Sequence, residues 1–98
     1  MANRNSSYDE IISEKFNSLE YAQGYLLHIV EEENLPLEQA LRETIKAMGL
    51  QKFSSASDLS IQAVSDFVSK RKRWSTDKLA KHIEVVFKLK VKLSLEAA

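Results

Sequence analysis

The sequence of 98 residues contains no cysteine, one proline and two glycines. Without cysteine, the chain has no disulfide bond, no thiolate metal site and no cysteine nucleophile. Two glycines do not make a glycine-rich loop that cradles phosphate, and His28 and His82 have no catalytic or metal-ligating spacing with carboxylates. We therefore expect neither an enzyme nor a protein that depends on a cofactor.

Long apolar runs are also missing. No run approaches the roughly 18 residues of a membrane span, and the polar start "MANRNSSYDE" lacks the apolar stretch of a signal peptide. We expect a cytoplasmic protein without membrane contact. The length, with 44% hydrophobic and 29% charged residues, fits one small domain over residues 1–98.

Net charge is zero, but the two halves of the chain differ. Residues 1–49 carry four Lys/Arg and nine Asp/Glu, whereas residues 50–98 carry ten and five, so the halves have charges of −5 and +5. Such asymmetry indicates a basic surface for a polyanion, with an acidic half that faces another partner. The alternative is two solvated faces that attract one another.

Apolar residues at steps of three and four predict an all-α fold of five or six helices. We expect helices over residues 8–16, 19–33, 36–48, 51–57 and 60–69, and a sixth after Ser75. Pro36 suits the first turn of the third helix and Gly49 the residue after its end. Ser60 and Ser75 are expected N-caps of the fifth and sixth helices.

The last stretch, "KLKVKLSLE", changes its period from 3.6 to 2 and predicts a short C-terminal strand. It is the only strand candidate, so its backbone needs a partner outside this chain, and a second copy is the simplest one. The expected residues of a homodimer interface are the apolar ones of the stretch, Leu89, Val91, Leu93 and Leu95.

Residues 50–76 have the spacing of a helix-turn-helix, whose second helix enters the major groove of DNA. The fifth helix places Ala63 and Val64 on an apolar face with Phe67 and Val68. Its polar face is free to contact bases, and the Gln62 amide matches the N6 and N7 atoms of adenine. A merely solvated glutamine is the alternative.

The run "KRKR" follows this helix directly. Four cations at that place are expected to contact the sugar-phosphate backbone, which positions the helix and gives salt-sensitive affinity. A solvated loop is the alternative, and Trp74 is expected to pack or stack beside the run. The candidate DNA-contacting residues are Lys52, Ser60, Gln62, Ser65, Asp66, Ser69, Lys70, Arg71, Lys72 and Arg73.

Four segments together resemble the HigA-like addiction-module antidote proteins, antitoxins with a lambda-repressor (XRE-type) helix-turn-helix. "SYDEIISEKFNSLEYAQGYLLHIVEE" is similar to the amino-terminal part of that family and "PLEQALRETIKAMG" to the helix that opens its DNA-binding domain. "LSIQAVSDFVS" resembles its recognition helix and "LKVKLSLE" its terminal strand. By this resemblance, residues 1–34 form a helical extension, residues 35–88 a DNA-binding core, and residues 89–98 a strand and tail.

The resemblance implies an antitoxin that binds operator DNA as a dimer, represses its own operon and neutralises a small toxin of the RelE/ParE class. Asp58 stands where the family commonly has the glycine of the turn, and Asp tolerates that backbone conformation. Asp66 stands on the DNA-facing side, where a carboxylate repels phosphate or accepts from a cytosine amino group. The competing interpretation is a protein-interaction module that keeps the helical fold without binding DNA.

Overall fold

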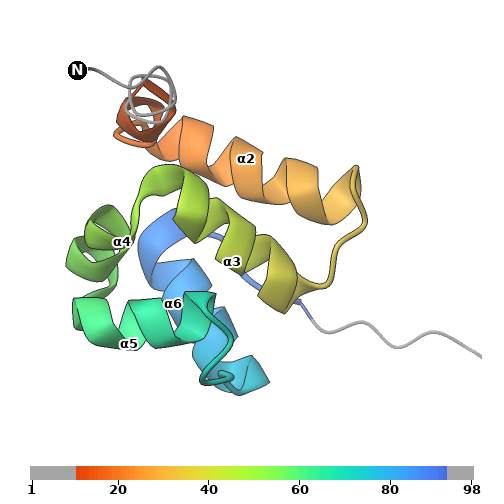
Figure 1. Cartoon of the computed structure of the whole chain (residues 1–98). Coiled ribbons are helices and arrows are strands. Elements are labelled where there is room, and N and C mark those ends of the chain that lie inside the picture. The colour runs from red at the N-terminus through yellow and green to blue at the C-terminus, as the bar shows by residue number, and fades with distance from the viewer. Residues whose placement is uncertain (1–10, 93–98) are drawn as a thin grey trace, which may run out of the picture.

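The computed structural model describes residues 11–92, and no strand occurs within that range. Residues 11–15 are helical, and five further helices follow (Figure 1). They are α2 (Leu19–Glu31), α3 (Leu37–Met48), α4 (Leu50–Ser57), α5 (Ile61–Val68) and α6 (Thr76–Phe87). The predicted all-helical fold is confirmed, with helix ends that differ by one or two residues from those expected.

Helix α3 lies at the centre of the fold. It contacts α2 on one side and α4 and α5 on the other, while α6 packs against α4 and α2 (Figure 1). Between these helices lie the fully buried rings of Phe53, Phe67 and Phe87. The core is therefore shared by all the helices, and α5 is fixed by contacts with both α3 and α4.

Serine residues cap the N-terminal ends of three helices, because a serine hydroxyl at this position accepts a hydrogen bond from a backbone amide of the first turn. The Oγ atoms of Ser60 and Ser75 accept hydrogen bonds from the backbone amides of Ala63 (3.1 Å) and Lys78 (3.2 Å). Both predicted caps are confirmed. Ser18 caps α2 in the same way through the amide of Tyr21.

Two residues with positive φ allow the chain to turn sharply around α4. Gly49, with φ of 103°, alone separates α3 from α4. Asp58, with φ of 62°, ends α4 in the left-handed conformation, which Asp tolerates better than most residues do. The connection between α4 and α5 is therefore only residues 58–60, and the predicted pair of helices with a tight turn is present.

The segment after α6 is the part of the predicted strand that the structure describes. Residues 88–92 have no regular secondary structure, and Leu93 and Leu95 lie outside the described residues. The expected alternation is nevertheless present, because Leu89 and Val91 pack against the core while Lys90 and Lys92 are exposed. A strand is not formed among the described residues, since these residues have no neighbouring strand with which to pair.

One apolar residue of α2 is exposed although it belongs to the buried face of the helix. Leu19 shares this face with Ala22 and Leu26, yet its side chain is 45% exposed at the start of α2, where it lines a hollow with Met48. Within residues 11–92, no helix has both the length and the hydropathy that a bilayer crossing requires.

Candidate nucleic-acid interface

Helix α5 has the two faces that its sequence predicts. Val64 and Phe67 are fully buried, whereas Gln62 is exposed. Ser65 and Asp66 are half-buried at the border between the two faces. The apolar face therefore anchors the helix, and the side chain expected to contact bases is accessible from solvent.

Gln62 and Asp66 lie one helical turn apart and bind each other. The Gln62 Nε2 atom donates to Asp66 Oδ1 over 3.0 Å, and Arg71 Nη1 lies 3.9 Å from the same oxygen. This carboxylate is therefore paired within its own helix and loop. The bond leaves the Gln62 carbonyl oxygen and one amide hydrogen available, and these are the acceptor and the donor that pairing with adenine uses.

The basic run, residues 70–73, wraps around the C-terminal end of α5. The carbonyl oxygen of Asp66 accepts hydrogen bonds from the amides of Arg71 (2.9 Å) and Lys72 (3.1 Å). Lys70 takes a left-handed conformation, with φ of 69°, that allows this turn. All four side chains are exposed, so the loop presents its charges from a hydrogen-bonded backbone.

Glu38 of α3 joins the basic run to the protein interior. Its two carboxylate oxygens accept from Arg42 Nη2 at 2.7 Å and from Arg73 Nη2 at 3.3 Å. The hydrogen bond from Arg73, together with the nearby Arg42 guanidinium, lowers the pKa of Glu38 below its ordinary value of 4.5, against an opposing effect of burial. The carboxylate is thus held ionised between two arginines.

Beneath the basic run lies a stack of side chains. Arg42 is buried, donates from Nε to the carbonyl oxygen of Phe67 (2.8 Å) and lies over the Phe67 ring at 4.6 Å. Trp74 stacks on Phe67 with 3.9 Å between the ring centroids and an interplanar angle of 10°. The predicted packing of Trp74 is confirmed, and it places the end of the basic run against the core.

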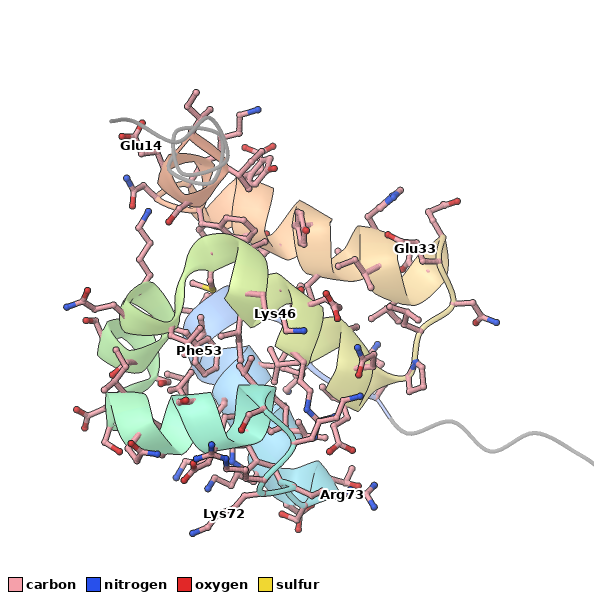
Figure 2. The ribbon with its side chains drawn as sticks, viewed as in Figure 1. Glu14, Glu33, Lys46, Phe53, Lys72 and Arg73 are labelled. Carbon is pink, nitrogen blue, oxygen red and sulfur yellow. The ribbon has the colours of Figure 1, made fainter. Side chains whose placement is uncertain are left out.

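The charge division along the sequence is also a division in space. Figure 2 shows Glu14 and Glu33 along the side of the fold that α2 forms, and Lys72 and Arg73 at the opposite side, beside α5 and α6. The exposed carboxylates of the first side belong to Glu14, Glu20, Glu31, Glu32 and Glu33. The protein therefore presents an acidic and a basic surface that face away from each other.

Lys52 is separated from the other candidate DNA-contacting residues. Its ammonium donates to the carbonyl oxygen of Ser13 at 2.5 Å, on the side of α4 that faces residues 11–15. It lines a hollow there with Phe16 and Val86. Ser60, Ser65, Ser69 and the residues discussed above, by contrast, all belong to α5, its cap or the loop that follows it.

Three residues that complete this surface were not predicted from the sequence: Glu38, Arg42 and Lys78. Arg42 and Glu38 are one turn apart on α3, which is a signal for an ion pair but not for its link to Arg73. Lys78 lies in the first turn of α6, and its ammonium is 5.0 Å from the centre of the Trp74 ring. The available signal was that Lys78 follows the expected N-cap Ser75 by three residues, which places it in the first turn of the helix, close to Trp74.

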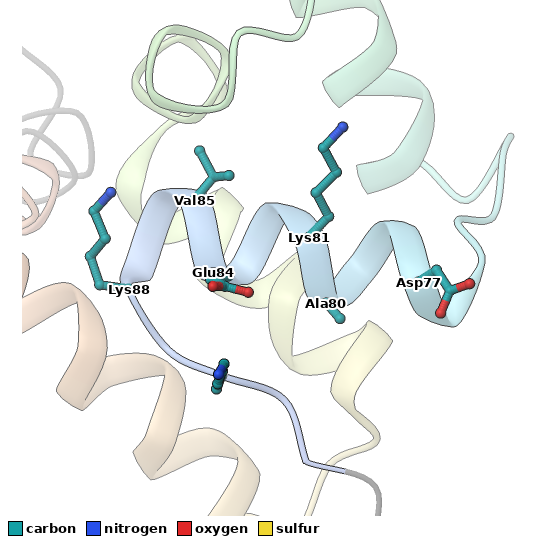
Figure 3. Close-up of a pocket in the computed structure, with 7 residues that line it drawn as sticks. Asp77, Ala80, Lys81, Glu84, Val85 and Lys88 are labelled. Atoms are coloured by element: carbon teal, nitrogen blue, oxygen red, sulfur yellow. The ribbon is translucent and has the colours of Figure 1, made fainter.

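Other hollows are less suited to an anion. One of about 700 Å³ runs beside α6, where two carboxylates, those of Asp77 and Glu84, offset most of the charge of Lys81, Lys88 and Lys90 (Figure 3). Among residues 11–92, no cluster of three histidine or carboxylate side chains is placed to hold a metal ion. The basic surface at α5 is thus the part of the described structure that is best suited to binding an anion.

Comparison of the chain with known protein families, with curated proteins and with solved structures finds no match.

Proposed function

We propose that the protein binds operator DNA as a dimer and acts as an antitoxin-type transcriptional repressor. The observation that carries DNA binding is the accessible polar face of α5 with four exposed cations directly after it. In a helix-turn-helix the second helix enters the major groove, while cations beside it contact phosphates. The short connection over residues 58–60 and the contact between α4 and α5 support this use.

The two parts of the surface have different tasks in this proposal. Gln62, in the first turn of α5, contacts a base edge through its carbonyl oxygen and its remaining amide hydrogen. Arg71 and Arg73 contact phosphates and exchange their carboxylate partners, Asp66 and Glu38, for the DNA backbone. Sequence preference therefore depends on Gln62, and affinity for any duplex depends on the arginines.

The dimer that we propose forms through residues 89–95. Leu89 and Val91 already face the core, and no backbone hydrogen bond joins residues 89–92 to the rest of the described chain. Antiparallel pairing with a second copy satisfies these backbone groups. The dimer then binds an inverted repeat whose half-sites lie about 10 base pairs, or a multiple of this, apart.

The test is a titration of variants against an operator duplex and a scrambled duplex at several salt concentrations. Arg71→Ala with Arg73→Ala is expected to weaken binding to both duplexes and to lower the salt slope by roughly 0.9 for each phosphate that the variant no longer neutralises. Gln62→Ala is expected to leave the slope unchanged and to cost about 1 to 3 kcal/mol on the operator alone.

A matched control separates local contacts from net charge. Lys15→Ala with Lys46→Ala also removes two exposed cations, on residues 11–15 and α3, and is expected to leave binding nearly unchanged. If the wild-type protein binds neither duplex at low salt, DNA binding is excluded. If the arginine variant binds as well as the control, the basic run is only a solvated loop.

The second candidate function is a protein-interaction module that does not bind DNA. The observation that favours it is Asp66, whose carboxylate lies at the border of the proposed DNA-contacting face and accepts a hydrogen bond from Gln62. Asp66→Asn distinguishes the candidates. In a DNA-binding protein it removes a repulsion and raises affinity for both duplexes, whereas an interaction module gains no salt-dependent binding to either.

The antitoxin part of the proposal places a basic toxin of the RelE/ParE class on the acidic surface around α2. Opposite charges accelerate the encounter of two proteins, and salt weakens this effect. Co-expression with the product of the neighbouring reading frame is expected to give a complex that survives gel filtration. A neighbouring product that is harmless alone and never co-elutes contradicts the antitoxin role and leaves DNA binding untouched.

A further inference from the structure

A hollow of about 330 Å³ separates the first half of α5 from the start of α6. Its walls come from α5, from the end of the basic run and from the first turn of α6. The side chains that matter for its chemistry are Gln62, Asp66, Lys72, Arg73, Trp74 and Lys78. Three cations therefore meet one carboxylate in this hollow, and that carboxylate already accepts a hydrogen bond from Gln62.

The cations of the hollow differ in how they are paired. Arg73 is bound by Glu38, so it must exchange a carboxylate before it binds another anion. Lys72 and Lys78 form no ion pair with any carboxylate of residues 11–92. Their charge is therefore available without the loss of an existing ion pair, which favours binding of an external anion.

Lys78 is fixed in place although its side chain is exposed. The amide of Lys78 donates to the Ser75 cap, and its ammonium lies 5.0 Å from the centre of the buried Trp74 ring. Trp74 in turn stacks on Phe67 of α5. The position of this cation relative to α5 is thus set by the core, and fewer conformations are lost when an anion binds.

We propose that this hollow binds one phosphate of the DNA backbone through Lys78 and Lys72, beside the base that Gln62 contacts. The proposal rests on the DNA-binding function proposed above and extends the interface to α6, outside the helix pair and the basic run. The chemical group is a phosphate diester of a duplex, because the hollow is open, is lined by cations and adjoins the exposed residue of α5.

The test compares Lys78→Ala with Lys81→Ala in the full-length protein. Both remove one exposed lysine from α6, but Lys81 lies one turn further along and does not line the hollow. Lys78→Ala is expected to weaken binding to operator and scrambled duplexes alike by roughly tenfold and to lower the salt slope by about 0.9. Lys78→Arg, which keeps the charge, is expected to retain the slope.

Trp74 supplies a second measurement, since it is the single tryptophan of the chain and lines the hollow. Its fluorescence is expected to change when either duplex is added to the wild-type protein, and to change less in Lys78→Ala. Far-UV circular dichroism melts check that each variant is folded.

The outcomes separate the two proposals. A wild-type protein that binds no duplex overturns DNA binding and this site together. A wild-type protein that binds DNA, with equal losses in the Lys78 and Lys81 variants or with no change in Trp74 fluorescence, overturns the phosphate site alone.

Discussion

Residues 70–73 and residues 88–92 are both lysine-rich stretches that leave the C-terminal end of a helix, α5 and α6. Each begins with a lysine in the left-handed conformation, Lys70 with φ of 69° and Lys88 with φ of 57°. After that residue they differ. The first curls back onto the carbonyl oxygen of Asp66, whereas the second runs on, and within residues 11–92 its one backbone hydrogen bond is that of the Lys88 amide.

The difference lies in what each stretch makes available to a partner. In residues 70–73 the first three backbone amides are hydrogen-bonded and the cations are exposed, so the stretch offers charge at fixed positions. In residues 89–92 the apolar side chains are packed and the backbone groups form no hydrogen bond with the rest of the described chain, so the stretch offers an edge for another chain. Two basic stretches therefore support two kinds of contact. The buried Trp74 fixes the position of residues 70–73, whereas the alternation of apolar and charged residues determines which side chains of residues 88–92 pack against the core.

The largest expected effect is on stability and comes from replacing Trp74, which anchors the first stretch to the core. Trp74→Ala leaves a cavity beside Phe67 and Phe53, and we expect a loss of about 3 to 5 kcal/mol in the free energy of unfolding. Urea unfolding followed by circular dichroism measures it. The matched change in the second stretch, Val91→Ala, removes half-buried methyl groups and is expected to cost about 1 kcal/mol. Equal losses contradict the difference in burial.

Deleting everything after Lys88 tests the second stretch. The deletion removes the edge and its apolar residues, so we expect light scattering to give the mass of one shortened chain, whereas the complete chain of 11.2 kDa is expected to give twice its own mass. Arg71→Ala with Arg73→Ala in the full-length chain is the control and is expected to remain a dimer. An unchanged dimer after the deletion places the interface elsewhere, with the helices before α3 as the next candidate.

Lower pH is expected to destabilise the folded protein through His82, which packs against the residue that follows the first stretch. Burial, followed by the nearby charges of Lys78 and Lys81, lowers the pKa of His82 below its ordinary value of 6.5, and its ring lies against Trp74. The unfolded chain therefore binds a proton at a pH where the folded chain does not. The free energy of unfolding is expected to fall as the pH drops below 6.5, by about 1.4 kcal/mol for each unit by which the pKa is lowered.

Thermal melts between pH 7.5 and pH 5.5 measure this loss, and His82→Gln is expected to reduce it. His28→Gln, which changes the exposed histidine of α2, is the control and is expected to behave as the wild type. If the His82 variant loses stability as steeply as the wild type, another group is responsible.

The smallest expected effect concerns the feature that the two stretches share, a first residue in the left-handed conformation. Lys70→Gly and Lys88→Gly each relieve a left-handed residue, and we expect each to raise the free energy of unfolding by up to about 1 kcal/mol, less the entropy that glycine gains in the unfolded chain. DNA binding is expected to distinguish them. Only Lys70→Gly removes a cation of the proposed interface, so equal affinities for a scrambled duplex contradict a role for Lys70.

Sequence alone determined the features that depend on near neighbours along the chain. Helix positions, the Ser60 and Ser75 caps, the left-handed Asp58 and the two faces of α5 all follow from contacts within about four residues, which a pattern records directly. The inward side of Leu89 and Val91 was predictable for the same reason. The alternation fixed which side chains pack, although no neighbouring strand is present in residues 11–92 to complete a sheet.

Tertiary structure alone decided which charges act together. Glu38 and Arg73 are 35 residues apart, and they meet only because α3 crosses behind the end of α5. The same crossing buries Arg42 against Phe67, while the packing of α4 directs Lys52 toward Ser13 and away from the basic run. Lys78 joins that run because Trp74 stacks on Phe67 and brings α6 beside α5. The packing of helices brings together charged groups that are far apart in the sequence. The strength of an electrostatic interaction depends on the distance between the charges, which the sequence spacing does not give.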